Sequence, residues 1–349
     1  MAARARAREP FEIGGEKVAP GERRLVHLPL SALSNQTPMA VPVSVTHARR
    51  DGPVLFVSAA VHGDELTGVA ICRRLLASKA LAITHGTLLI VPIVNAFGFI
   101  SHSRYLPDRR DLNRSFPGSV KGSLAAQLAN LFLTEVVARS SHGIDLHSAA
   151  IHRSNLPQIR VDSHDEAAFR LAEAFGAPII VHSGLREGSL RAAALKKGVP
   201  VIVYEAGEGL RADELSVRVG IEGVLQVLAH LGMSRRRRTP PRPPVLATSS
   251  RWIRAEESGL FRPFRDIGDH VAGGERIGLI ADPYGERETD IRAGAAGIII
   301  GRANIPAVNQ GDALFHVAKV DNASQLGEHY DSLERRLGTE PMLDEDEII

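Results

Sequence analysis

The sequence VLFVSAAVHGDE, residues 54–65, decides the fold. Residues 54–61 form a short apolar run rich in valine, which is typical of a buried strand. Residues 65–78 follow with the periodicity of an amphipathic helix. A buried strand that leads directly into a helix is one step of the alternation found in sheets covered by helices.

The same alternation continues as far as residue 231. Predicted strands cover residues 87–94, 143–146, 178–182 and 200–204. Predicted helices cover residues 123–139, 165–175, 189–197 and 212–231. This pattern predicts an α/β fold with a mainly parallel sheet flanked by helices on both faces. Residues 25–47, upstream of the first buried strand, are expected to add edge strands.

The composition changes after residue 231. Residues 235–250 begin with four arginines and continue with four prolines, so they cannot continue a helix. We expect an interdomain connection there, whose arginines form a solvated charge run rather than a polyanion site. The predicted division is an α/β domain over residues 1–234, a linker over 235–250, a small all-β, barrel-like module over 251–320 and an acidic tail over 321–349.

The small module has closely spaced turn signals, such as Gly273-Gly274 and Ala296-Gly297. These segments resemble the paired hairpins of biotinyl and lipoyl carrier domains. A carrier must present a lysine on a tight turn, and residues 250–317 contain no lysine, which excludes that function. We expect a packing or assembly module instead.

Composition excludes several classes of function. The 42 basic and 40 acidic residues leave a formal net charge of +2, which argues against nucleic-acid binding, and aromatic residues make up only 5%. No apolar run reaches the length of about 18 residues that a membrane span requires, and no secretory signal is present. The single cysteine, Cys72, indicates a reducing compartment, so we expect a cytoplasmic protein. Any metal site must therefore use histidines and carboxylates.

Three predicted strands end in ionisable residues. His62 follows the strand 54–61 with Glu65 three positions later, His147 follows the strand 143–146, and Glu205 follows the strand 200–204. Ligands of open α/β sheets gather at the carboxyl ends of the strands. Two histidines and one glutamate form a typical catalytic zinc set, which leaves one coordination position open.

Each of these residues also has a purely structural interpretation. Glu65 is placed where a carboxylate caps the next helix, and the histidines are equally compatible with hydrogen bonds at a sheet edge. Glu205 is placed where it can pair with an arginine. Asp145 points to the same face as His147, so it either orients the imidazole or has a structural role.

An arginine-rich segment, residues 104–118, follows the strand that ends at Asn95. Its arginines and Asn113 are suited to binding a carboxylate or polarising a carbonyl, because a guanidinium binds carboxylate oxygens in pairs. The alternative is a solvated surface loop. The apolar Leu112 and Phe116 on either side of Asn113-Arg114 argue against that alternative.

Together these segments resemble the succinylglutamate desuccinylase and aspartoacylase family, a branch of the zinc carboxypeptidase superfamily. The matching motifs are His-Gly-Asp-Glu at 62–65, Asp-Leu-Asn-Arg at 111–114 and Asp-Leu-His at 145–147. The resemblance covers about residues 25–231 and extends into the β-module. It implies a carboxypeptidase-like fold and a zinc-dependent amidohydrolase that removes the acyl group of a small N-acyl amino acid.

The resemblance also implies roles for individual residues. It implies one Zn²⁺ per chain held by His62, Glu65 and His147, with Glu205 as general base and Arg104 beside the scissile carbonyl. It implies a substrate carboxylate held by Asn113 and Arg114, and a further arginine that is Arg191, with Arg186 as a rival.

The resemblance leaves the substrate open. The arginine-rich segment departs from the dedicated aspartoacylases, and the chain looks closer to a bacterial branch that contains an N-acetyl-diaminobutyrate deacetylase. A desuccinylase, a zinc carboxypeptidase acting on peptides and a non-catalytic binding protein are the alternatives. By analogy, the β-module suggests a homodimer.

Overall fold

The computed structural model describes residues 8–32, 35–236 and 244–320. The strands up to residue 236 are β1 (Phe11–Ile13), β2 (Glu16–Val18), β3 (Glu22–Ala32), β4 (Pro38–His47), β5 (Arg50–Ala59), β6 (His85–Val91), β7 (His142–His147), β8 (Arg153–Val161), β9 (Ile179–His182) and β10 (Val201–Glu208). The α-helices are α1 (Thr67–Ala77), α2 (Ala96–Ile100), α3 (Leu124–Glu135), α4 (Glu166–Phe175), α5 (Leu190–Leu195) and α6 (Glu214–His230). Short 3-10 helices cover Lys79–Leu81, Leu112–Arg114 and Val137–Arg139.

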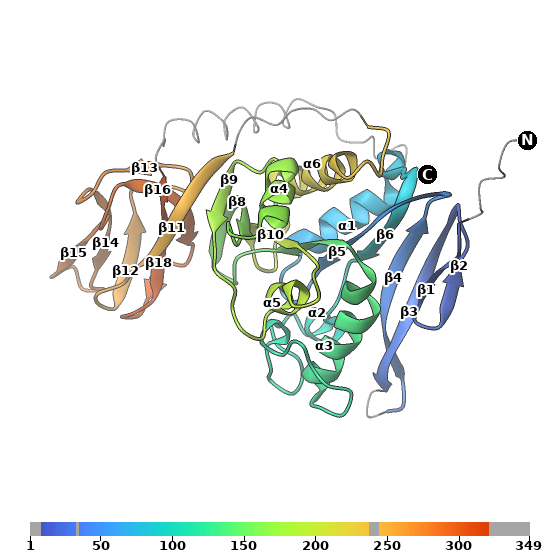
Figure 1. Ribbon diagram of the computed structural model, residues 1–349. Helices are drawn as coiled ribbons and strands as arrows, with labels where there is room; N and C mark the ends of the chain where they lie inside the picture. The colour runs from blue at the N-terminus through green and yellow to red at the C-terminus, as the bar shows by residue number, and fades with distance from the viewer. Residues whose placement is uncertain (1–7, 33–34, 237–243, 321–349) are drawn as a thin grey trace, which may run out of the picture.

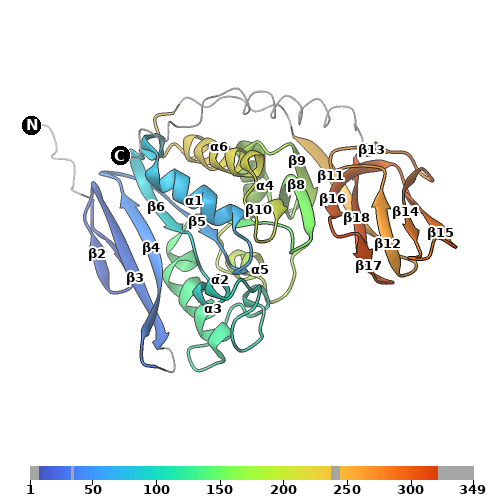
Figure 2. The ribbon, with the colours of Figure 1, turned by 180° about the vertical axis from the view of Figure 1, so that it is seen from behind.

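Helices cover both faces of a large sheet, which confirms the α/β class (Figures 1 and 2). One buried apolar cluster lies between the sheet and helices α1, α4 and α6, and another lies between the sheet and helices α3 and α5. Strand β5 supplies both, because Leu55 and Val57 face the first cluster and Phe56 faces the second. This explains why its sequence is a continuous apolar run rather than an alternating one.

The sheet is mixed, so the expectation of a mainly parallel sheet holds only in part, and strands β8 and β9 are one of its parallel pairs. Strands β6, β5, β7 and β10 pair in parallel, in that order. Strand β8 is antiparallel to β10, and β3 and β4 form an antiparallel pair. The physical reason is the length of the connections, because a parallel pair needs a long crossover. Strands β4 and β8 instead follow β3 and β7 after short connections, so each runs in the opposite direction to the strand before it.

The C-terminal part is built from strands. These are β11 (Val245–Arg254), β12 (Gly259–Pro263), β13 (His270–Val271), β14 (Arg276–Ala281), β15 (Glu288–Arg292), β16 (Gly297–Ala303), β17 (Ala307–Val308) and β18 (Ala313–Val320). Strands β15, β14, β12 and β17 form a separate four-stranded sheet, which packs with the other strands around Phe261, Leu314 and Phe315.

The other C-terminal strands extend the large sheet and close a ring. Strand β11 pairs with β9, β18 with β11, β16 with β18, and β16 with β8. The expected barrel therefore borrows β8 and β9 from the preceding α/β part, and Figure 1 shows the two parts side by side.

The predicted domain division remains a prediction. Strand β11 begins at Val245, inside the range predicted as a linker, while residues 237–243 and the predicted acidic tail, 321–349, lie outside the described residues. Among the residues that the structure describes, none of the helices combines the length and the apolarity needed to cross a membrane.

Candidate active site

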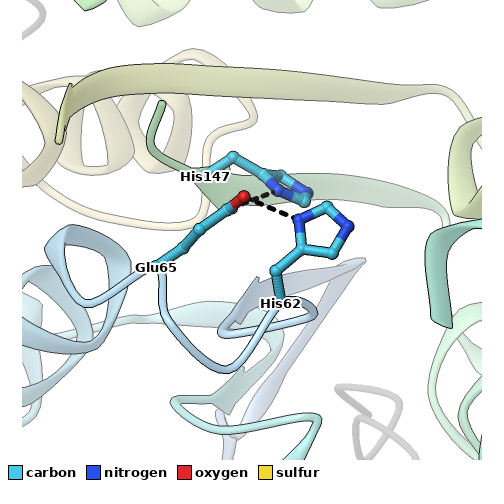
Figure 3. Close-up of side chains that lie close together, drawn as sticks. All are labelled: His62, Glu65 and His147. Carbon is cyan, nitrogen blue, oxygen red and sulfur yellow. Dashed lines mark hydrogen bonds and ion pairs between the residues drawn. The ribbon is translucent and has the colours of Figure 1, made fainter. Parts of the chain in front are cut away.

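Three side chains meet at the carboxyl ends of β5 and β7. His62 and Glu65 lie in the loop between β5 and α1, and His147 is the last residue of β7 (Figure 3). The two strands are parallel neighbours, with Ala59 opposite Leu146, which brings the loop and the strand end together. Gly63 is required in this loop, because an added Cβ would lie 1.9 Å from the backbone of Gly98.

Both imidazoles turn the same ring nitrogen towards Glu65. The Nδ1 atom of His62 lies 2.7 Å from Oε1 of Glu65, and Nδ1 of His147 lies 2.7 Å from Oε2. All three residues are at least 97% buried. The helix-cap interpretation of Glu65 is wrong, since Leu66 is the N-cap of α1 and makes no side-chain capping bond.

The opposite nitrogen of each imidazole is paired with an aspartate. Nε2 of His147 lies 2.7 Å from Asp145, and Nε2 of His62 lies 3.1 Å from Asp111. Ser58 Oγ donates in turn to Asp145 at 2.7 Å. These contacts fix the orientation of both rings, as they commonly do in metal sites. The orienting position of Asp145 agrees with its expected direction, whereas that of Asp111 was not predicted.

The carboxylates make this a site that favours positive charge. Burial disfavours the charged form of His147, but Asp145 and Glu65 outweigh it and raise the pKa of this histidine well above its usual range. Burial likewise opposes ionisation of Glu65, and the two histidines overcome it and hold its pKa well below the usual range. A cation placed between the three side chains would gain the same attraction.

The donor set fits Zn²⁺. Ligand atoms of His62, Glu65 and His147 all lie within 4.8 Å of one another. Two imidazole nitrogens and a carboxylate are the ligands of one common class of catalytic zinc site. The chain also places the supporting carboxylates that such ligands require.

A cavity of about 330 Å³ opens above this cluster. It is lined by every residue that the sequence analysis singled out for catalysis or binding: Arg104, Asn113, Arg114, Arg186, Arg191 and Glu205. The structure therefore brings these residues together with His62, Glu65 and His147, although they come from widely separated segments.

Glu205 is held beside the cluster by the sheet. It lies opposite His147 in the parallel pair of β10 and β7, so both side chains share one face. Asn155 Nδ2 donates to Oε2 of Glu205 at 2.9 Å, and a guanidinium nitrogen of Arg160 lies 3.5 Å from Oε1. The predicted pairing with an arginine is present, and it leaves Glu205 on the wall of the cavity.

Two arginines flank the cavity in different ways. Arg104 lies 3.3 Å from Glu65 and 2.9 Å from Asp111, so its guanidinium is fixed close to the cluster. Arg191 donates to the carbonyl of Gly184 at 2.9 Å, and its Nη1 atom is buried without a partner among the described residues. Arg186 also lines the cavity.

Asn113 and Arg114 are positioned by the loop that carries them. Oδ1 of Asn113 accepts a hydrogen bond from the backbone of Leu190 at 2.9 Å, which leaves the amide nitrogen of the side chain for a ligand. Arg114 donates to the carbonyl of Asn113 at 2.6 Å and lines the cavity.

Several residues of the cavity wall were missed by the sequence analysis. Those with large side chains include Arg153, Asn155 and Arg160 on β8 and Trp252 on β11. Strand β8 reads RSNLPQIRV, in which polar residues and a proline interrupt the apolar pattern that predicts a buried strand. Because several of these polar residues line the cavity, the sequence pattern did not predict this strand.

A second group of two histidines and a carboxylate lies on the surface. It consists of Asp162, His164 and His182, whose ligand atoms also lie within 4.8 Å of one another. Nδ1 of His182 already accepts hydrogen bonds from the backbone nitrogen and the hydroxyl of Ser163, at 3.2 and 2.8 Å. His164 is exposed.

Comparisons with known proteins identify the family of this chain. Residues 51–231 match the succinylglutamate desuccinylase/aspartoacylase catalytic domain. The chain is 28% identical over 296 residues to N-alpha-acetyl-L-2,4-diaminobutyric acid deacetylase from Halomonas elongata, which covers 80% of this chain and 86% of the relative.

Solved structures share the fold over nearly their whole length. A succinylglutamate desuccinylase from Silicibacter superposes with a TM-score of 0.77 and 25% identity, over 86% of this chain and 95% of that one. The product-bound ectoine utilization protein EutE (DoeB) from Ruegeria pomeroyi gives a TM-score of 0.77 and 26% identity, over 89% of this chain and 99% of that one.

Proposed function

Because this chain belongs to the succinylglutamate desuccinylase/aspartoacylase family, we propose that it is a zinc-dependent amidohydrolase that removes the acyl group from an N-acyl amino acid. The observation that carries the proposal is the buried group of His62, Glu65 and His147 beneath a cavity that Glu205 and several arginines also line. The relative from Halomonas elongata, named as a deacetylase of an N-acetylated diamino acid, supports the same reaction class.

His62, Glu65 and His147 would hold the zinc ion. When bound, Zn²⁺ supplies Lewis-acid chemistry that polarises a carbonyl and makes water more acidic. Asp111 and Asp145 keep both imidazoles turned towards Glu65, at the hydrogen-bond distances given above. The protein therefore presents a preorganised set of ligands.

Glu205 is the general base of the proposed reaction. It takes a proton from the attacking water and passes it to the leaving nitrogen of the amide. The hydrogen bond from Asn155 to Oε2 holds the carboxylate on the cavity wall beside His147.

The arginines would bind the negative charges of the substrate and of the reaction. Arg104 lies close to Glu65 and would donate to the oxyanion that develops on the scissile carbonyl. Asn113 and Arg114 would hold the carboxylate of the amino acid and so align the amide with Glu205. Arg191 would neutralise a further negative charge through its buried, unpartnered Nη1 atom.

Substitution of the proposed base tests this function. The Glu205→Gln protein should retain its zinc and lose about 100- to 10,000-fold in kcat, the usual contribution of general base catalysis. The assay measures release of free amino acid from N-formyl, N-acetyl and N-succinyl amino acids, with a short peptide panel to detect a carboxypeptidase. Glu173→Gln, at an exposed position of α4, is the matched control and should behave as the wild type.

Full activity of Glu205→Gln would contradict the assigned base. Hydrolysis of the peptides, with none of the N-acyl amino acids, would contradict the proposed substrate class.

A further inference from the structure

We propose that the C-terminal strands take part in substrate selection, and that Trp252 forms the apolar wall of the cavity against which the acyl chain or the amino-acid side chain packs. This inference rests on the proposed function, because it assigns a role to a residue of the same cavity. It gives β11, β16 and β18 a direct part in recognition in addition to packing.

Trp252 reaches the cavity through a continuous row of paired residues. Asn155 on β8 pairs with Gly301 on β16, and Gly301 pairs with His316 on β18. His316 in turn pairs with Trp252 on β11. Because directly paired residues of neighbouring strands lie on the same face of a sheet, this row continues the cavity side of β8 across the C-terminal strands.

Gly301 keeps this row close to the proposed catalytic base. An added Cβ at Gly301 would lie 2.9 Å from Oδ1 of Asn155, the residue whose amide donates to Glu205. The C-terminal strands therefore approach the cavity wall as closely as a glycine allows.

The indole of Trp252 is fixed in its orientation. It stacks on the imidazole of His316 with ring centroids 4.6 Å apart and an interplanar angle of 11°. The guanidinium of Arg153 lies over the indole, 5.6 Å from its centroid. Ser250 Oγ lies 2.9 Å from Nε2 of His316 and holds the imidazole in turn. A ring held in this way loses little freedom when a ligand packs against it.

The remaining cavity wall is mostly polar. Besides Trp252, the apolar side chains on the wall are Ala149, Ala150 and Val203, all of them small. Trp252 is therefore the largest apolar side chain on this wall and the one best suited to distinguish methylene groups of the substrate. In a hydrophobic pocket one methylene changes the specificity constant by about 10-fold or more.

The test compares Trp252→Ala and Trp252→Phe with the wild type as zinc-loaded, full-length proteins. One substrate series varies the acyl group on a fixed amino acid (formyl, acetyl, propionyl, succinyl), and the other varies the amino acid under a fixed acetyl group. We expect Trp252→Ala to reduce the ratios of kcat/KM within one series by about 10-fold, mainly through KM, and Trp252→Phe to restore part of them. Tyr284→Ala, at an 88% exposed aromatic position between β14 and β15 and outside the cavity lining, should leave the ratios unchanged.

Unchanged ratios in Trp252→Ala would overturn the inference while leaving the deacylase intact. The series that loses discrimination shows whether the acyl chain or the side chain packs on Trp252. Absence of hydrolysis by the wild type of every substrate would contradict the proposed function instead.

Fluorescence gives a readout that does not depend on turnover, because Trp252 is the only tryptophan of the chain. The indole emission of Glu205→Gln should shift or be quenched when the best-hydrolysed substrate is added, with a midpoint that matches calorimetry. Unchanged emission while calorimetry reports binding would show that the ligand does not touch Trp252.

Discussion

Among the described residues, two groups contain two histidines and a carboxylate whose ligand atoms lie within 4.8 Å of one another, and they differ in burial and in the partners of their imidazoles. His62, Glu65 and His147 lie at the carboxyl ends of β5 and β7, whereas Asp162, His164 and His182 lie at the ends of β8 and β9. Both pairs of strands are parallel, so the same topology gathers both groups at a strand edge.

The first group is buried and the second is not. In the first, each imidazole turns Nδ1 to Glu65 while an aspartate holds Nε2. In the second, His182 uses its Nδ1 lone pair to accept from Ser163, and His164 is exposed. The two groups therefore place similar donors equally close together, but only the first combines burial with carboxylates that orient both rings, the features that favour metal binding.

Removal of one histidine from each group should give the largest difference. We expect His147→Ala to weaken zinc binding by more than about 100-fold, since loss of an orienting partner alone costs 10- to 100-fold. His182→Ala is the matched control and should bind zinc as the wild type does. Competition with a chromophoric chelator measures both affinities. Equal losses in the two variants would remove the distinction between the groups.

Removal of an orienting partner should have a smaller effect. Asp145→Asn keeps the shape of the side chain but removes the charge beside Nε2 of His147. We expect zinc affinity to fall by about 10-fold. Ser163→Ala removes the hydroxyl partner of His182 and should leave the affinity unchanged. An unaltered affinity in Asp145→Asn would show that burial alone defines the site.

His316 extends the comparison to a buried imidazole that has no carboxylate partner among the described residues. It is 5% exposed, and burial together with the positive charge of Arg160 lowers its pKa to about 3. The folded protein then binds fewer protons than the unfolded chain between about pH 3 and the ordinary pKa of 6.5. The stability contributed by neutral His316 is therefore complete above pH 6.5 and decreases as the pH falls.

We expect the free energy of unfolding to be about 2 kcal/mol lower at pH 5 than at neutral pH because of His316. This change affects stability and has the smallest expected effect on function. His316→Phe keeps an aromatic ring beside Trp252 and should remove this part of the pH dependence. Urea unfolding of both proteins at pH 5 and pH 7 measures it. An identical change with pH in the two proteins would contradict the assignment to His316.

Local pattern was enough to predict the central strands and the place where His62, Glu65 and His147 come together. The apolar runs that became β5, β6, β7 and β10 predicted the strands, and the polar residues at their ends predicted where the chemistry gathers. The cluster of His62, Glu65 and His147 lies where those strand ends meet.

The remaining features depend on pairing between distant segments. The sequence of strand β8 lacks the apolar pattern that predicts a strand, because several of its side chains are polar and line the cavity. Its pairing with β16 joins residues about 150 positions apart. Asp111 lies within a motif that was noticed, yet only the folded chain shows that it holds His62. The mixed sheet and the position of Trp252 on the cavity wall likewise depend on pairing between segments that are distant in the sequence.

Diffraction from crystals grown with zinc, measured on both sides of the zinc absorption edge, tests most directly whether the buried group is the metal site. We expect one strong anomalous peak per chain between Nδ1 of His62, Nδ1 of His147 and the Glu65 carboxylate. A peak at Asp162, His164 and His182 with none at the buried group would contradict the proposed metal site and the enzymatic function built on it.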